Sequence, residues 1–92
     1  MSDRFFLHDE EEESSVRFVS FMGDNDERFD LALVSTERYY GKQVVLDMRT
    51  QRFALLGVDD LEEQGLLEDA YQIDEETAEE LRAFLLEAIV EY

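Results

Sequence analysis

Three carboxylates, Asp24, Asp26 and Asp30, are the residues whose spacing first suggests chemistry, because the first two match the start of a calcium-binding loop. Such a loop needs an oxygen ligand at its fifth position and a glycine at its sixth. In this chain those positions hold Arg28 and Phe29. The sequence therefore does not predict a calcium site here.

The other chemistry-bearing residues are few. The chain has one histidine, His8, and no cysteine, which rules out thiolate catalysis and cysteine-ligated metals. A lone histidine without an obvious nucleophile is more often exposed or structural than catalytic. The four glycines are isolated, so no phosphate-binding loop is present. We therefore expect no catalytic residues, no cofactor and no metal, and we do not expect an enzyme.

The length and composition predict one small domain. Ninety-two residues can bury a single thin core, and a hydrophobic content of 45% is too high for a disordered chain. The N-terminal residues contain an apolar run of only three residues, too short for a signal peptide or a membrane span. We expect a single domain over residues 1–92 and a cytoplasmic location.

Acidic residues dominate the charge and are concentrated late in the chain. The net charge is −17, and residues 58–92 alone hold 13 acids and one base. Such a surface repels nucleic-acid phosphates and anionic lipids, so we expect no direct nucleic-acid binding and no membrane binding. A basic protein partner or a cation is compatible with the charge, and solubility alone explains it as well.

The elements that must position any site begin with strands. Alternating apolar and polar residues predict strands over residues 15–22 and 28–35 and a β-hairpin over residues 42–57. Residues 3–8 form a possible fifth strand, at the edge of the sheet. The acidic residues 9–14 are expected to form a solvated loop, because adjacent like charges repel.

The hairpin has two faces of different composition. One face carries Val44, Leu46, Met48, Phe53 and Leu55, and we expect helices to bury it. The opposite face mixes polar residues with Val45, Ala54 and Leu56, so it is only half polar.

Helical spacing replaces alternation from Asp59 onward. We expect a helical turn at 59–63, a short helix at 66–71 and a long last helix with Asp74 as its N-cap. Its predicted apolar stripe is Ala78, Leu81, Leu85, Ala88, Ile89 and Tyr92. The predicted fold is α+β: an antiparallel meander sheet of four to five strands over residues 15–57, followed by a helical segment, 59–92, with two C-terminal helices packed on one face.

Four short motifs give the chain a family resemblance: DRFFLHD at 3–9, RFDLALV at 28–34, RYYGK at 38–42 and DDLEE at 59–63. Together they resemble a family of small acidic proteins of Gram-positive bacteria that is classed as a domain of unknown function. The resemblance covers almost the whole chain. It implies a bacterial cytosolic protein, and it carries no site residues because none of the motifs is a catalytic signature.

Two functions are compatible with these patterns. The first is a non-catalytic interaction module that self-associates as a homodimer through the sheet face that the helices leave bare. The second is an acidic decoy that mimics nucleic acid and occupies a basic partner through its acidic half. Tyr39 and Tyr40 are either a recognition patch beside the basic flanks of the hairpin or a cap on the core. The predicted interaction residues are Val19, Phe21, Val34, Tyr39, Tyr40, Val45, Arg52 and Leu56.

Overall fold

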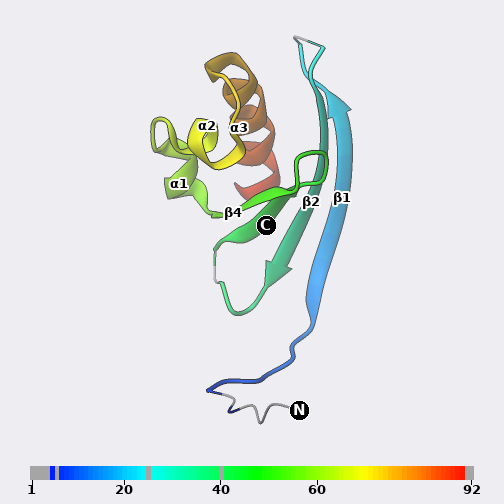
Figure 1. Ribbon diagram of the computed structural model, residues 1–92, viewed down its shortest axis with the longest axis vertical. Coiled ribbons are helices and arrows are strands. Elements are labelled where there is room, and N and C mark those ends of the chain that lie inside the picture. The colour runs from blue at the N-terminus through cyan, green and yellow to red at the C-terminus, as the bar shows by residue number, and fades with distance from the viewer. Residues whose placement is uncertain (1–4, 6, 25, 40, 91–92) are drawn as a thin grey trace.

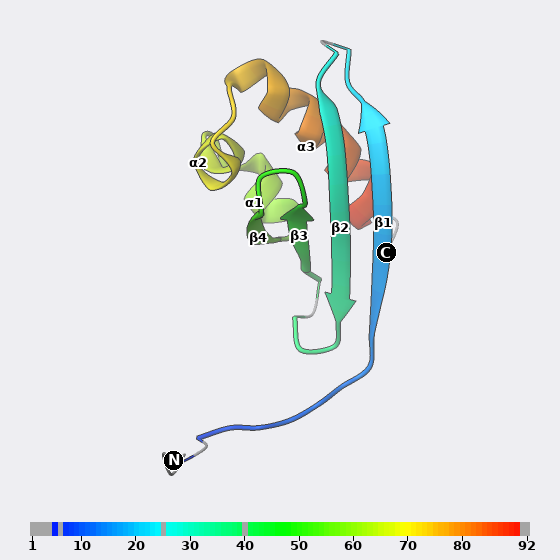
Figure 2. The same cartoon turned by 45° about the vertical axis from the view of Figure 1, so that its right-hand side comes forward.

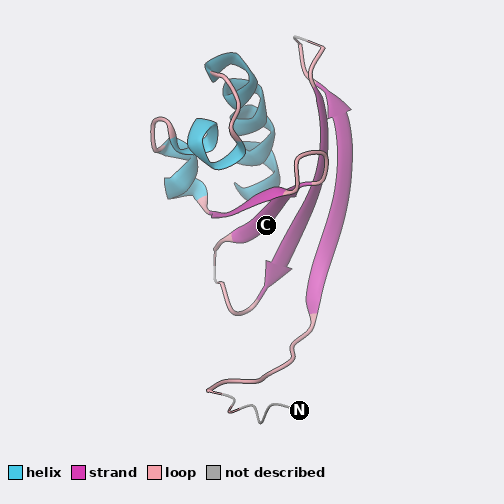
Figure 3. Cartoon of the chain, in the orientation of Figure 1, coloured by secondary structure: helices cyan, strands magenta, loops and turns pink. Residues whose placement is uncertain are grey.

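The computed structural model describes residues 5, 7–24, 26–39 and 41–90, and it shows a sheet with helices on one side (Figure 1, Figure 3). The strands are β1 (Ser14–Met22), β2 (Arg28–Thr36), β3 (Gln43–Asp47) and β4 (Arg52–Leu56), and the helices are α1 (Val58–Glu62), α2 (Leu66–Tyr71) and α3 (Glu75–Val90). Neighbouring strands pair antiparallel in the order β1-β2-β3-β4. The predicted α+β meander is confirmed, with four strands, and the described residues form three helices where two were expected.

The described residues that precede β1 lie outside the sheet. Much of the possible fifth strand, residues 3–8, lies outside the described residues, and the described Phe5, Leu7 and His8 are not in a strand. The acidic residues that follow are exposed and extended up to the start of β1 (Figure 2).

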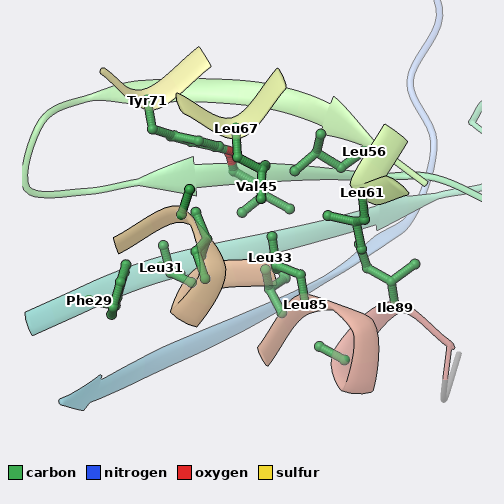
Figure 4. Packing of buried hydrophobic residues seen from close by; sticks show 13 residues of the cluster. Phe29, Leu31, Leu33, Val45, Leu56, Leu61, Leu67, Tyr71, Leu85 and Ile89 are labelled. Carbon is green, nitrogen blue, oxygen red and sulfur yellow. The ribbon is translucent and has the colours of Figure 1, made fainter. Parts of the chain in front are cut away.

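The core lies between the sheet and the helices (Figure 4). Its buried residues come from β2, β3, β4 and all three helices: Phe29, Leu31, Leu33, Val45, Leu56, Leu61, Leu67, Tyr71, Ala78, Leu81, Leu85, Ala88 and Ile89. The predicted stripe of α3 is confirmed for its first five residues, each 6% exposed or less. Its last member, Tyr92, lies outside the described residues.

The ends of the helices follow from local hydrogen bonds. The backbone N–H of Thr77 donates to Asp74 Oδ1 at 2.8 Å, which confirms Asp74 as the N-cap of α3. At α1, the backbone N–H of Gly57 donates to Asp60 Oδ2 at 2.8 Å. Lys42 Nζ lies 3.1 Å from the same oxygen, so an ion pair joins the start of α1 to the residue before β3.

The face of the hairpin that packs on the helices is the reverse of the one expected. Val45 and Leu56 are fully buried, whereas Phe53 is 67% exposed and Met48 48% exposed. The prediction that the face with Met48 and Phe53 is covered by helices is therefore wrong.

Strand register explains the reversal. Leu31 and Leu33 of β2 point toward the helices, and Leu33 lies opposite Val45 of β3. Side chains of directly opposed residues share a face, so Val45 must also point inward, and its own partner Ala54 follows. Because both faces of the hairpin are rich in apolar residues, alternation alone could not decide between them.

Candidate functional site: the outer face of the sheet

The helices cover one face of the sheet and leave the other bare (Figure 1, Figure 3). On the bare face, residues opposed across the strands form two apolar rows that each cross all four strands. We call these rows the outer apolar face. One row is Val16, Val34, Val44 and Leu55, and the other is Phe18, Ala32, Leu46 and Phe53.

The edges of the outer apolar face are the most exposed. Phe18 on β1 is 71% exposed and Phe53 on β4 is 67% exposed. Val16 and Leu55, at the ends of the other row, are 49% and 37% exposed. Ala32 in β2 is only 3% exposed, because it is small and larger cross-strand neighbours flank it. The surface therefore has exposed aromatic side chains at both edges and a small, covered side chain near its centre.

Neither row contains a charged residue, although 36% of the chain is charged. Charge begins one row further toward the β1–β2 turn, at Asp30. Ser20 Oγ donates to Asp30 Oδ1 at 2.6 Å, and Arg28 Nε donates to Asp30 Oδ2 at 2.9 Å. The hydrogen bonds from Ser20 and Arg28 lower the pKa of Asp30. This rim carboxylate is thus already satisfied within the chain.

Four of the predicted interaction residues point toward the helices instead. Val45 and Leu56 are 0% exposed and belong to the core, so neither can contact a partner in this fold. Val19 and Phe21 of β1 are partly buried against the core. The ring of Phe21 stacks on Phe29, with centroids 4.8 Å apart.

The remaining predicted residues are divided between the outer face and the turns. Val34 lies in the outer apolar face. Tyr39 is 41% exposed in the β2–β3 turn, and Arg52 is exposed at the start of β4. Tyr40 lies outside the described residues. Of the seven predicted residues that the structure describes, it brings Val34 alone into the candidate site.

Sequence reasoning missed the two aromatic edges, Phe18 and Phe53. Phe53 lies on the hairpin face that was expected to be buried, and neither residue is among the eight predicted interaction residues. The signal that identifies them is the pairing of β1 with β2 and of β3 with β4, which places both in the row of Ala32. Strand pairing depends on the tertiary fold, so the pattern of a single strand does not reveal it.

The basic residues near the hairpin make contacts within the chain. Arg49 Nη1 donates to the carbonyl oxygen of Arg28 at 2.7 Å. Arg38 Nη2 donates to Glu10 Oε1 at 2.7 Å and lies 2.9 Å from His8 Nε2. The arginines of the predicted basic flank therefore bond within the chain. Arg49 contacts the start of β2, and Arg38 contacts the acidic residues 9–13, which we call the acidic arm.

The described residues offer little else for chemistry. Among them, no group of three or more His, Cys, Asp or Glu side chains is arranged to hold a metal ion. A small hollow beside the β2–β3 turn contains Thr36 Oγ1 and Gln43 Oε1, two buried oxygens without a hydrogen-bond partner in the described part of the chain. Two acceptors anchor a ligand less firmly than a surface that crosses four strands, so the outer apolar face is the stronger candidate.

The length and hydrophobicity of the helices bear on whether any of them could span a membrane. No helix in the described part of the chain is long and apolar enough to cross a bilayer.

Comparison with known proteins places the chain in a family. No curated protein matches the sequence. The family model for SAV0927-like proteins matches residues 7–87, which include all four strands and most of α3. The expectation of a family of unknown function is thereby confirmed, while the Gram-positive origin and the acidic character of that family stay predictions. On this match, the chain belongs to the SAV0927-like family.

Proposed function

We propose that this protein is a small, non-catalytic interaction module that self-associates through its outer apolar face. The observation that supports the proposal is the pair of uncharged apolar rows on the side of the sheet that the helices leave bare. The solvent face of an antiparallel sheet usually carries polar residues, and a contiguous exposed apolar patch usually marks an interaction site.

The surroundings of His8 support a non-catalytic role. Its Nε2 lies 2.5 Å from Glu10 Oε1, and Arg38 Nη2 lies 2.9 Å from the same nitrogen. All three side chains are exposed on the arm and the β2–β3 turn. This group fixes the arm to the turn, and it resembles a surface ion-pair cluster more than a general base beside a nucleophile.

Sedimentation equilibrium over a range of protein concentrations tests self-association. We expect a monomer–dimer equilibrium for the natural chain and a shift to monomer in Phe18→Ser and Phe53→Ser. Burying a phenylalanine contributes about 1.5–3 kcal/mol, so each substitution should raise the dissociation constant at least about 10-fold. Both residues are mainly exposed, so the monomer fold should survive their loss.

A matched control comes from the helical side. Val58 on α1 is 37% exposed, as Leu55 is on the outer apolar face. Val58→Ser should leave the association constant unchanged. A monomeric mass for the natural chain at every concentration, or equal effects of Val58→Ser and Phe18→Ser, would contradict the proposal.

The acidic helices favour a second candidate, a nucleic-acid-mimicking decoy. A shallow hollow between α1, α2 and α3 is bordered by Glu62, Glu68, Glu75 and Glu79. Arg82 forms an ion pair with Glu79 at the same place. If this surface occupies a basic partner, the protein should displace DNA from a basic DNA-binding domain at low salt. A variant with Glu62, Glu68 and Glu75 changed to Gln should displace less DNA. If the variant and the natural chain displaced equal amounts, the hollow would be excluded as the binding surface.

A further inference from the structure

We infer that two copies pack outer face against outer face as an aligned β-sandwich, with β1 of each copy over β4 of the other. The inference rests on the proposed self-association and specifies its geometry. In this assembly the two sheets form the inner layers and the helices form the outer layers.

The symmetry of a dimer limits how two such faces can meet. A twofold interface uses the same surface on both copies, so the axis must lie in the plane between the two sheets. An axis parallel to the strands and midway between β2 and β3 gives the largest overlap. It places β1 over β4 and β2 over β3 of the second copy, and it keeps each apolar row over the same row. Sheets that pack in this way keep their strands within about 30° of each other.

The order of side-chain sizes along the rows fits this axis. In the row that begins with Phe18, the smallest residue, Ala32, comes to lie opposite Leu46 of the second copy, so a small side chain meets a long one. At the edges of the same row, Phe18 meets Phe53 of the second copy, and aromatic pairs of this kind are favourable beyond their buried area.

An axis perpendicular to the strands fits less well. It sets β2 over β2 and pairs the two rows with each other, so Ala32 lies opposite Val34, a shorter side chain than Leu46. It also separates Phe18 from Phe53, because β1 then lies over β1 of the second copy.

The distribution of charge keeps the repulsion between two copies low in this arrangement. Residues 58–92 carry 13 of the 25 acids and one of the eight bases, and all three helices lie in this part of the chain. In the sandwich, both sheets lie between the two helical layers, so the most acidic parts of the copies are as far apart as the assembly allows. Repulsion between the copies falls with that distance and with salt. The surfaces in contact carry no charge in either row.

The area of the face sets the expected affinity. With strands about 4.8 Å apart and about 3.4 Å per residue, the two rows cover roughly 260 Å² on each copy, and the outer surface of all four strands covers roughly 460 Å². A standard stable interface buries about 800 Å² per partner, and transient complexes bury less. We therefore expect a reversible dimer that dissociates on dilution.

Cysteine cross-linking tests the geometry, and the natural chain has no cysteine to interfere. In the inferred dimer, Val16 of one copy lies opposite Leu55 of the other, and both are partly exposed in the monomer. An equimolar mixture of Val16→Cys and Leu55→Cys proteins should form a covalent heterodimer with a short bismaleimide. Val16→Cys alone should react far less, because the two copies of that residue are separated by about three strand spacings, roughly 14 Å, in addition to the gap between the sheets. Val58→Cys, on the helical side, should form no dimer with either protein.

The outcomes separate this inference from the proposed function. A dimer in sedimentation that yields the Val16–Leu55 product supports both. A dimer in which Val16→Cys links mainly to itself overturns the inferred arrangement and leaves self-association standing. A natural chain that stays monomeric overturns both.

Discussion

Tyr71 joins the helical layer to the sheet at the scale of a single residue. It is 1% exposed, and its hydroxyl donates to the carbonyl oxygen of Val45 at 2.7 Å. Burial raises the pKa of the Tyr71 phenol far above its usual value, so the group stays neutral and remains a donor. We expect Tyr71→Phe to lower the free energy of unfolding by about 1 kcal/mol in urea titrations, because the Val45 carbonyl loses a buried partner.

Tyr39 provides the matched comparison for that change. It is 41% exposed in the β2–β3 turn, so Tyr39→Phe removes a hydroxyl that water can solvate. Its effect should stay within about 0.5 kcal/mol. If both variants lost the same free energy, the bond between Tyr71 and Val45 would not be a source of stability.

The same residues show why burial in the hairpin could not be predicted. Val45 and Leu56 are core residues, and Phe53 is not, although phenylalanine is the largest of the three. Pairing with β2 decides this, and it places the small side chain of Ala54 on the inward face with Val45 and Leu56, where α2 contacts β4. Hydrophobicity ranks residues one at a time, and it cannot report the shape of the opposing layer.

Asp74 is the N-cap of α3, and the charge on its carboxylate makes the stability of this helix depend on pH. Hydrogen bonds from Thr77 lower the pKa of Asp74. A carboxyl whose pKa is lower in the folded than in the unfolded state stabilises the fold above its unfolded pKa, about 3.9, and loses that contribution as the pH falls through the folded pKa. We expect Asp74→Ala to lower the urea midpoint at neutral pH, and the difference from the natural chain to shrink below about pH 4.

Asp74→Asn separates the cap from the charge. Asparagine keeps an acceptor oxygen for the Thr77 N–H, so the urea midpoint should stay close to that of the natural chain at neutral pH. The pH-dependent part of the stabilisation should be absent. A midpoint for Asp74→Asn as low as that for Asp74→Ala would show that the charge, and not the hydrogen bond, holds the start of α3.

Elements with one polar side were predicted well, and elements with two apolar sides were not. The stripe of α3 repeats every three to four residues and has a charged opposite side, so its buried face followed directly from the sequence. The strands of the hairpin were located correctly, but their orientation depends on pairing with β2. The residues of the candidate site were predicted least well. A one-residue error in the orientation of a strand moves its core residues to the outer face and its outer residues to the core.

At the scale of the whole molecule, the three parts of the chain have different electrostatic characters. The acidic arm and the acidic side chains of the helices face solvent, while the outer apolar face carries no charge in its two rows. A net charge of −17 opposes the approach of a second copy, and the apolar face favours it. The balance between the two must shift with ionic strength, since salt screens the first and does not weaken the second.

That balance makes a prediction that distinguishes the two proposed functions. Raising NaCl from about 0.05 M to about 0.5 M shortens the screening length from above 10 Å to below 5 Å, so self-association through the outer apolar face should become tighter in sedimentation equilibrium. Binding of a basic partner by the acidic helices should become weaker over the same range, because it depends on attraction between charges. Self-association that weakens with salt would mean that the copies meet through acidic and basic side chains, such as the exposed Arg52, and would place the interface away from the apolar rows.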